Sequence, residues 1–314
     1  MRAVFMGTPD FSVGTLEEMI RAGHQVVGVF TQPDKPKGRG KSLQMTPVKE
    51  AALAHGIPVY QPVKIREPEN MEILKELAPE VIVVVAFGQI IPRAILELPK
   101  YGCINVHASL LPKYRGAAPI QWAVIDGEET SGVTIMQMDE GLDTGDMLLK
   151  GEIALDPQET GGSLFDRLSA LGARLLVEAL AQIEAGTIAR EKQPQESPTP
   201  YAAQITKAQG EIRWEDPAVK IERLIRGLNP WPSAYTRLGG KTLKLWKAQA
   251  LPQEENSDKE AAPGTVVARD RESITVQTGQ GLLKLLEVQL EGKKRMDTAS
   301  FLRGYSLEEG TRLG

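Results

Sequence analysis

Apolar and polar segments alternate along the first 190 residues in a way that predicts strands followed by helices. Short runs rich in β-branched residues have strand length, and the segments between them repeat their apolar positions as amphipathic helices do. The run 81–86 is apolar on both faces, which is typical of a central strand in a parallel sheet. Strands are predicted at 3–6, 25–31, 57–60, 81–86, 102–107 and 132–138, and helices at 11–22, 47–55, 69–77, 117–126 and 163–185. This order predicts an α/β fold in which helices cover a parallel sheet.

The pattern changes after Gly186. The segment QPQESPTP at 193–200 holds three prolines and no apolar period, so it is interpreted as a linker. A helix is predicted at 213–227, and short strands follow at 234–238, 243–247, 264–268, 274–278 and 282–289. Short strands separated by turns predict a small β-barrel. The chain is therefore divided into an α/β domain at 1–189, a linker at 190–206 and a barrel domain at 207–314.

Composition narrows the class of protein. The 314 residues suit two domains, and 41% hydrophobic with 25% charged residues is typical of soluble globular proteins. The longest apolar run, 81–87, is too short to span a bilayer, and the first residues do not resemble a signal peptide. Cys103 is the one cysteine, which excludes an intrachain disulfide and a zinc site built from several thiolates. A cytoplasmic protein is expected.

Charge is unevenly distributed along the chain. The net charge is −4, so the chain as a whole does not look like a basic nucleic-acid binder. Residues 206–314 nevertheless carry 18 Lys and Arg against 15 Asp and Glu, whereas residues 1–205 carry 19 against 26. The segment KPKGRGK at 35–41 holds four basic residues, and its glycines and proline predict a loop without regular structure. Such a run is most simply a solvated loop, although it could also contact phosphates.

Two motifs that would suggest other ligands are incomplete. Gly7-Thr8-Pro9 follows the first strand, but the dinucleotide fingerprint G-x-G-x-x-G needs three glycines, and only the first is well placed. A tight strand-to-helix turn is the simpler interpretation. The acidic segment DEGLDTGD at 139–146 lacks the spacing of an EF-hand, so a calcium loop is rejected.

Asn105 and His107 lie at the end of the strand predicted at 102–107. Residues two apart on a strand point to the same face, so the carboxamide and the imidazole would lie side by side. Open parallel sheets bind ligands at the carboxyl ends of their strands, which is where His107 is expected. An isolated N-x-H would most simply be two satisfied polar residues at a strand end. A carboxylate from the segment 139–146, which follows another predicted strand, could orient His107.

Longer motifs around these residues resemble the folate-dependent formyltransferase family. The core of the resemblance is INVHASLLPKYRG at 104–116 with GVTIMQMDEGLDTGD at 132–146. MGTPDFS, GVFTQPDKPKGRGK, GAAPIQWAVIDG and NPWP extend it over nearly the whole chain. The set of motifs is specific, whereas the single tripeptides are not. The resemblance implies a Rossmann-like catalytic domain joined by a linker to a small OB-like barrel.

The resemblance also implies a catalytic set and a reaction. The Asn, His and Asp of the family match Asn105, His107 and Asp143. The reaction would move the formyl group of 10-formyltetrahydrofolate to the α-amino group of methionyl initiator tRNA, with no metal expected. Asn105 and His107 would stabilise the oxyanion, and Asp143 would orient His107 and assist proton transfer. The group that accepts the proton of the amine is left open.

Binding residues follow from the same resemblance. The turn that resembles the folate-contacting turn of the family consists of Ser109, Leu110, Leu111 and Pro112. The segment 87–90, with Phe87 and Gly88, is a second candidate wall for the folate. With tRNA as the substrate, the candidate contacts near the acceptor stem are Lys35, Lys37, Arg39 and Lys41. The barrel would be a second electrostatic platform for tRNA, and a monomer is expected.

Four other functions fit less well. A formyltransferase acting on a phosphoribosyl glycinamide resembles only the N-terminal half of the chain. One acting on an amino-sugar nucleotide also has a C-terminal barrel and is harder to exclude, although it usually belongs to a longer chain. A related hydrolase that releases formate would carry an additional dehydrogenase domain. A non-catalytic nucleic-acid-binding module would not need Asn105, His107 and Asp143 together.

Overall fold

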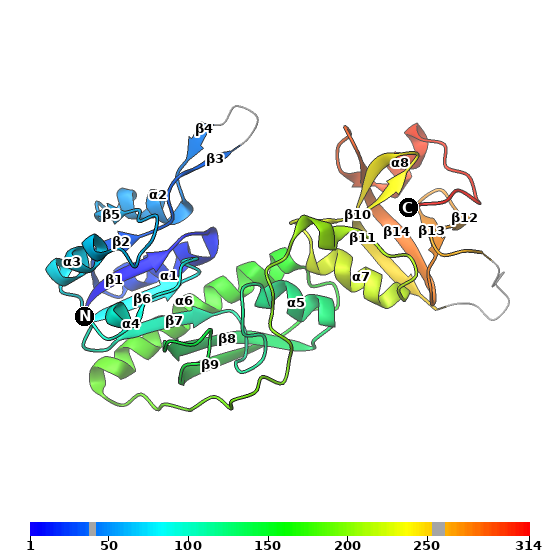
Figure 1. Ribbon diagram of the computed structural model, residues 1–314. Coiled ribbons are helices and arrows are strands. Elements are labelled where there is room, and N and C mark those ends of the chain that lie inside the picture. The colour runs from blue at the N-terminus through cyan, green and yellow to red at the C-terminus, as the bar shows by residue number, and fades with distance from the viewer. Residues whose placement is uncertain (38–41, 253–260) are drawn as a thin grey trace. The chain divides into compact units, whose positions relative to one another are not determined.

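The computed structural model describes residues 1–37, 42–252 and 261–314, and Figure 1 traces the chain. Contacts between residues divide it into two compact units. The first comprises Met1–Pro119, Thr130–Ala154 and Phe165–Ala202, and the second comprises Ile120–Glu129, Leu155–Leu164 and Ala203–Gly314. The domain boundaries at 1–189, 190–206 and 207–314 stay a prediction, because the second unit also takes two short segments from the N-terminal half.

The first unit holds the α/β part of the chain. Its strands are β1 (Arg2–Gly7), β2 (Gln25–Phe30), β3 (Lys35–Lys37), β4 (Ser42–Gln44), β5 (Val59–Tyr60), β6 (Val81–Val85), β7 (Cys103–His107), β8 (Thr130–Gln137) and β9 (Met147–Ala154). Its helices are α1 (Asp10–Arg21), α2 (Pro47–Ala54), α3 (Pro68–Leu77), α4 (Arg93–Leu96) and most of α6 (Gly161–Ala185). The strands and helices predicted for this part are present with small shifts at their ends, and β3, β4, β9 and α4 are additional.

Seven of these strands form one sheet in the order β5–β2–β1–β6–β7–β8–β9. Neighbours from β5 to β7 pair in parallel, whereas β8 pairs antiparallel with β7 and β9 antiparallel with β8. The sheet is therefore mixed, and the strand predicted at 132–138 departs from the expected parallel pairing. The loop 138–146 between β8 and β9 is too short for the crossover that a parallel pair needs.

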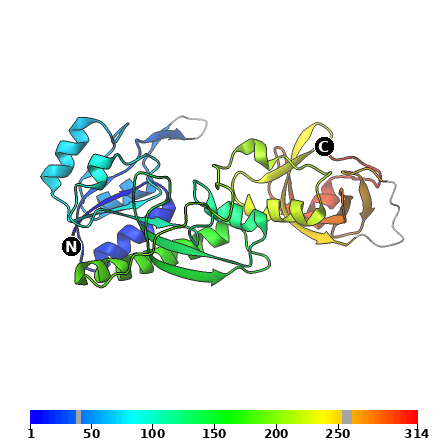
Figure 2. The same ribbon diagram turned by 60° about the horizontal axis from the view of Figure 1, so that its bottom comes forward.

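Helices cover both faces of the sheet. On one face α1 and α6 lie side by side (Figure 2), where the Ser169 hydroxyl donates to the Phe11 carbonyl at 3.0 Å and the ring of Phe11 meets that of Phe165 edge to face. On the other face, side chains of the strands pack with those of α3 and α4 in a buried cluster that includes Val4, Met6, Phe30, Leu74, Ile82, Val84, Ile95 and Cys103. Alternate residues of β1 and β6 enter this cluster, which is the period expected of a strand covered on both faces.

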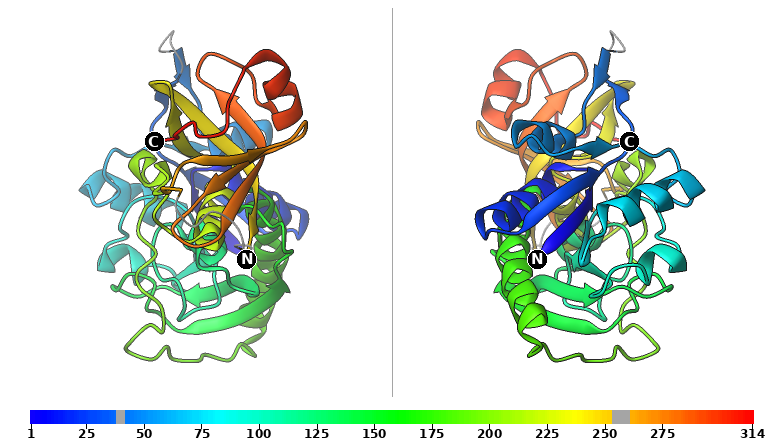
Figure 3. Two further views of the ribbon diagram at one scale, coloured as in Figure 1. Left: turned by 90° about the vertical axis from the view of Figure 1, so that its right-hand side faces the viewer. Right: turned by 90° about the vertical axis from the view of Figure 1, so that its left-hand side faces the viewer.

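The second unit is built around an antiparallel sheet (Figure 3). Its strands are β10 (Ala234–Leu238), β11 (Lys241–Leu251), β12 (Val266–Arg269), β13 (Ile274–Gln277), β14 (Leu282–Leu290) and β15 (Met296–Asp297), and its helical segments are most of α5 (Pro119–Asp126), the 3₁₀ turn η1 (Lys207–Gly210), α7 (Ala218–Gly227) and α8 (Thr298–Gly304). The strand order is β10–β11–β14–β13–β12, with β15 on β14. Aliphatic side chains of the strands bury Ile221 and Ile225 of α7 in one core. The predicted fold class, a Rossmann-like part followed by a small β part, is confirmed.

The basic segment is partly regular. Lys35 pairs with Gln44 and Lys37 with Ser42, so β3 and β4 form a hairpin. The prediction of a loop without regular structure is wrong for Lys35–Lys37. Proline is tolerated in a two-stranded ribbon because each strand has one edge without hydrogen bonds to a neighbouring strand. The strand that pairs with Lys35–Lys37 is Ser42–Gln44, which lies beyond the basic run that suggested a loop.

No helix in the described part of the chain is long and apolar enough to cross a membrane.

Candidate active site

Three of the polar residues predicted from the sequence lie together over one face of the sheet. In the pair β7–β8, Asn105 lies opposite Met136 and His107 opposite Thr134. Opposed residues of an antiparallel pair place their side chains on the same face. The register thus puts Asn105 and His107 on one face, as the spacing predicts, and the third residue, Asp143, reaches the same place from a loop.

Asp143 approaches His107 by a route that differs from the expected one. Because β8 runs antiparallel to β7, its last residue, Gln137, pairs with Ile104 and not with the residues beside His107. The loop 138–146 turns back from there, and Asp143 Oδ1 lies 3.7 Å from His107 Nδ1. Asp143 has a φ of 57°, in the left-handed region that non-glycine residues seldom adopt. The contact therefore comes from the conformation of the loop and not from neighbouring strand ends.

The ring of His107 lies between the Tyr114 carbonyl and the Asp143 carboxylate. Its Nε2 lies 2.9 Å from the backbone oxygen of Tyr114. A carbonyl oxygen can only accept, so Nε2 carries a proton and donates it. Nδ1 is then the nitrogen that faces Asp143, and a second proton on Nδ1 would give an imidazolium paired with the carboxylate. The side chain is only 7% exposed, so its neighbours fix the orientation of the ring.

The turn after Pro112 supplies partners for both His107 and Asp143. The backbone N–H of Gly116 donates to Asp143 Oδ2 at 2.9 Å. Gly116 has a φ of 126°, which favours glycine, and a Cβ at this position would lie 2.6 Å from the carbonyl oxygen of Ala202. Tyr114, whose carbonyl holds His107, also has a positive φ, of 55°. Sequence reasoning missed Tyr114 and Gly116 as parts of the site; the glycine after a Pro-containing turn was the available signal.

Asn105 has no partner within the site. The residue is only 9% exposed. Among the residues that the structure describes, no hydrogen bond joins its carboxamide to another protein group, and Thr15 Oγ1 is the one fully covered side-chain polar atom without a partner. The Asn105 carboxamide is therefore not sealed off, and its two N–H groups and its oxygen are available to a ligand.

Buried Thr134 shapes the turn predicted to contact folate. Its Oγ1 donates to the Ser109 carbonyl at 2.7 Å and accepts from the Leu111 N–H at 3.0 Å. The Ser109 hydroxyl in turn donates to the Lys113 carbonyl at 2.6 Å, and the Leu111–Pro112 peptide bond is cis. These backbone and hydroxyl groups therefore stabilise the conformation of the turn through hydrogen bonds within it and with Thr134.

The apolar side chains around the turn differ in exposure. Leu111 is 1% exposed in a cluster with Met136 and Met147, and Phe87 is 2% exposed in the core under α4. Both residues are almost completely covered, and the Leu111 N–H and the Phe87 carbonyl already have protein partners. Ile90, in the predicted segment 87–90, is 76% exposed, and Leu142, which the sequence did not single out, is 59% exposed. These two are the apolar side chains that solvent reaches beside β6 and beside Asp143.

The four predicted tRNA-contacting residues are only partly covered by the structure. Lys35 is exposed in β3, and Lys37 belongs to the same strand. Arg39 and Lys41 lie outside the described residues. Leu43, on the opposite strand of the hairpin, is 71% exposed. The hairpin thus presents an apolar side chain to solvent as well as a basic one.

Cys103 is not equipped to act as a nucleophile. It is fully buried at the start of β7, and burial raises the pKa of its thiol to about 12. A thiol in that state is neutral near pH 7 and unreactive. No cluster of three or more His, Cys, Asp or Glu residues suited to a metal ion occurs in residues 1–37, 42–252 and 261–314.

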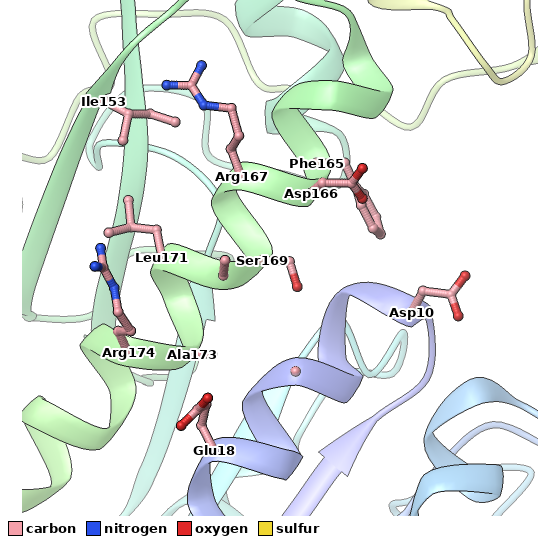
Figure 4. Close-up of a pocket in the computed structure, with 12 residues that line it drawn as sticks. Asp10, Glu18, Ile153, Phe165, Asp166, Arg167, Ser169, Leu171, Ala173 and Arg174 are labelled. Atoms are coloured by element: carbon pink, nitrogen blue, oxygen red, sulfur yellow. The ribbon is translucent and has the colours of Figure 1, made fainter.

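Two cavities lie away from His107 and Asp143. One, of about 770 Å³, lies between α1 and α6, where Figure 4 shows side chains of both charges, among them Glu18, Arg167 and Arg174. The other, of about 370 Å³, is lined by residues of the β3–β4 hairpin together with Thr8 and Gln32. Neither is lined by a residue of the predicted catalytic set.

Comparison with known proteins connects this geometry to a family. Residues 1–180 match the model of the Formyl transferase family, and residues 204–306 match that of the formyl transferase C-terminal domain. A methionyl-tRNA formyltransferase of Agathobacter rectalis is 61% identical over 99% of this chain and 99% of that protein. Another, of Lachnospira eligens, is 58% identical over 100% of both.

Solved structures share the fold at much lower identity. HypX from Aquifex aeolicus in complex with tetrahydrofolic acid has a TM-score of 0.63 and 19% identity, covering 96% of this chain and 47% of that chain. The N-formyltransferase from Helicobacter canadensis in complex with folinic acid and dTDP-3-aminofucose has a TM-score of 0.68 and 19% identity, covering 94% of this chain and 100% of that chain. At this identity the likeness concerns the fold alone.

Proposed function

Because the chain belongs to the formyl transferase family, we propose that it transfers the formyl group of 10-formyltetrahydrofolate to the α-amino group of methionyl initiator tRNA. The observation that carries the proposal is the match, over essentially the whole of both chains, to proteins named methionyl-tRNA formyltransferase. The alternative of an amino-sugar nucleotide as the acceptor has only a likeness of fold behind it, at 19% identity. The enzyme would act in the cytoplasm as a monomer.

The proposed folate site lies between β6 and the loop that carries Asp143. 10-Formyltetrahydrofolate supplies the formyl carbon that is transferred. Exposed Ile90 and Leu142 offer apolar contacts, and the exposed backbone at Gly88 offers polar groups to a pterin. The turn from Ser109 to Pro112 would contribute the partly exposed side chain of Leu110, whereas Ser109 and Leu111 are buried. Ser109, Leu110, Leu111, Pro112, Phe87 and Gly88 thus remain proposed contacts, although Leu111 and Phe87 are almost completely covered by protein.

Asn105 is proposed to hold the formyl oxygen. Its carboxamide is free of protein partners and nearly buried, so its N–H groups can donate without first breaking another hydrogen bond. Negative charge develops on the formyl oxygen as the amine attacks the carbon. A preorganised donor of this kind is worth about 3–4 kcal/mol in the transition state of acyl transfer.

His107 is proposed to work through Nδ1. Its Nε2 proton is committed to the Tyr114 carbonyl, so Nδ1 is the ring atom left for the substrates. In the neutral ring Nδ1 accepts a proton, and in the protonated ring it donates a hydrogen bond. His107 can therefore stabilise the oxyanion only as an imidazolium, whose charge would lie close to the Asp143 carboxylate, 3.7 Å from Nδ1. The same atom can relay a proton from the attacking amine toward N10 of the folate.

The α-amino group of the acceptor needs little activation. Its reference pKa is about 7.7–8.0, so a useful fraction is a neutral nucleophile near neutral pH. No enzyme nucleophile is needed, in keeping with the burial of Cys103. The side chains of this site are therefore proposed to orient the reactants and stabilise charge.

The β3–β4 hairpin and the second unit are the proposed tRNA contacts. Lys35 and Lys37 lie on β3, and Arg39 and Lys41 follow in the same basic run. Each Lys or Arg that neutralises a phosphate releases counterions, which makes binding sensitive to salt. Residues 207–314 are proposed as a separate platform for tRNA, joined to the catalytic domain through residues 190–206.

A comparison of acceptors tests the proposal. Purified protein and 10-formyltetrahydrofolate are incubated with methionyl initiator tRNA, methionyl elongator tRNA, a phosphoribosyl glycinamide or an amino-sugar nucleotide, and formylated product is quantified. We expect product with the initiator tRNA at a rate far above that with the other three. Faster formylation of either small amine would contradict the proposal.

A further inference from the structure

The segment 191–202, taken as a linker from the sequence, forms a strap beside the loop that carries Asp143. All of it belongs to the first unit. At one end Glu191 and Met147 exchange backbone hydrogen bonds of 2.8 and 2.9 Å. At the other end Ala202 donates to the Arg115 carbonyl at 2.8 Å and accepts from Ala117 at 2.8 Å. The strap is thus fixed at the start of β9 and at the turn that follows Pro112.

Between its ends the strap holds the loop that carries Asp143. Gln193 Nε2 donates to the carbonyl oxygen of Asp143 at 2.9 Å and to that of Gly145 at 2.8 Å. These two carbonyls flank Thr144, so a single carboxamide grips the loop on both sides of that residue. The left-handed backbone of Asp143 therefore has a specific support.

Arg115 fixes Gln193 in turn. Its guanidinium donates to Gln193 Oε1 at 3.0 Å and to the carbonyls of Pro194 at 2.8 Å and Gln195 at 3.2 Å. Arg115 is only 8% exposed. Because a carboxamide whose oxygen is held in this way cannot flip, its NH₂ group stays directed at the Asp143 loop. Arg115 and Gly116 are consecutive, so the same turn anchors the Asp143 side chain through Gly116 and its backbone through Gln193.

We propose that Gln193 is a positioning residue for formyl transfer. Its carboxamide keeps Asp143 in the left-handed conformation that directs the carboxylate at His107. The inference rests on the proposed function, since it assumes that Asp143 assists His107 in catalysis. Within the described residues Gln193 has no hydrogen bond to His107, so its proposed effect on catalysis is exerted through Asp143.

Steady-state kinetics of the full chain tests this role. Gln193→Ala removes the two hydrogen bonds to the loop, and Gln193→Glu keeps the size but replaces the donor by an acceptor. Gln195→Ala is the matched control, because among the described residues Gln195 takes part through its backbone carbonyl and not through its side chain. Displacing a catalytic group by about 1 Å costs on the order of 100-fold in rate. We expect both Gln193 variants to lose about 10- to 100-fold in kcat with KM for both substrates nearly unchanged. The control should match the wild type.

Combination with Asp143→Asn separates positioning from general support of the fold. Assays are run well below the unfolding midpoint of each variant, so that all are folded. If Gln193 acts through Asp143, then Gln193→Ala costs nearly nothing further in an Asp143→Asn background. Equal losses in both backgrounds, or full kcat in Gln193→Ala and Gln193→Glu, would overturn the inference. Full activity of Asp143→Asn alone would instead overturn the proposed catalytic set.

Discussion

Replacing Asp143 by Asn removes one charge from the site and little else. The Asn side chain has nearly the same volume and keeps an oxygen that can accept the Gly116 N–H, which is 2.9 Å from Oδ2 in the wild type. The Gln193 contacts reach the backbone of the loop and are indifferent to the substitution. What is lost is the attraction that the carboxylate would exert on an imidazolium formed at His107 during the proposed reaction.

The size of that loss follows from the geometry. The two side chains approach to 3.7 Å and are 7% and 21% exposed. Two unit charges about 4 Å apart attract by about 4 kcal/mol at an effective dielectric constant of about 20. Exposure of the carboxylate lowers this value, so we take about 2–4 kcal/mol, which corresponds to roughly 30- to 1,000-fold in rate.

Single-turnover formyl transfer measures this quantity without interference from product release. Asp143→Asn is compared with the wild type and with Asp146→Asn, which removes a charge from the same loop three residues further on. We expect the rate to fall by roughly 30- to 1,000-fold in Asp143→Asn and to stay near the wild-type value in the control. A loss below about threefold in Asp143→Asn, under 0.7 kcal/mol by the same conversion, would refute the reasoning that the charge acts through His107.

Three further predictions concern the packing and titration of single residues. Because burial raises the pKa of Cys103 to about 12, its thiol should resist alkylation at pH 8 in the native protein and react in the unfolded chain, as measured by mass spectrometry. Rapid alkylation of the native protein would contradict the burial of Cys103. A Cβ on Gly145 would overlap the Gln137 carbonyl oxygen, so Gly145→Ala should lose roughly 1–3 kcal/mol of stability and should also have a lower kcat. A normal urea midpoint and normal turnover in this variant would contradict the prediction. Burial, with the charge of the N-terminus, lowers the pKa of His24 in the folded chain, so the unfolded chain binds a proton there first as pH falls below about 6.5. Between pH 7.5 and 5 the wild type should therefore lose more stability than His24→Gln, as measured by urea titrations. Equal losses in the two proteins would contradict this prediction.

Apolar periodicity correctly predicted the helices and strands whose type follows from their own residues and does not depend on the segments they pack against. The run predicted at 81–86 is apolar on both faces, and its residues Val81–Val85 form the buried strand β6. The strand predicted at 234–238 has the bounds of β10. The i, i+2 spacing of Asn105 and His107 was sufficient to place both on one face. These features depend on the local backbone alone, which a sequence records directly.

Features that depend on a distant partner could not be predicted in this way. The antiparallel direction of β8 depends on how the chain returns to the sheet, and a strand pattern looks the same in both directions. The contact between Asp143 and His107 depends on the left-handed backbone of Asp143. Because that position is not a glycine, its residue type does not signal this conformation. Gln193 lies in a proline-rich segment without apolar periodicity, so the sequence did not predict that its side chain would hydrogen-bond to the Asp143 loop.

One experiment tests directly whether this chain joins a formyl group to the α-amino nitrogen of methionine on initiator tRNA with the help of Asn105. Protein, 10-formyltetrahydrofolate carrying a ¹³C-labelled formyl group, and charged initiator tRNA react for a single turnover, and the aminoacyl end is analysed by mass spectrometry for wild type and for Asn105→Ala. We expect labelled N-formylmethionine with the wild type and a rate lower by roughly 100- to 1,000-fold with Asn105→Ala. Absence of label on the methionine nitrogen with the wild type, or an undiminished rate with Asn105→Ala, would contradict this expectation.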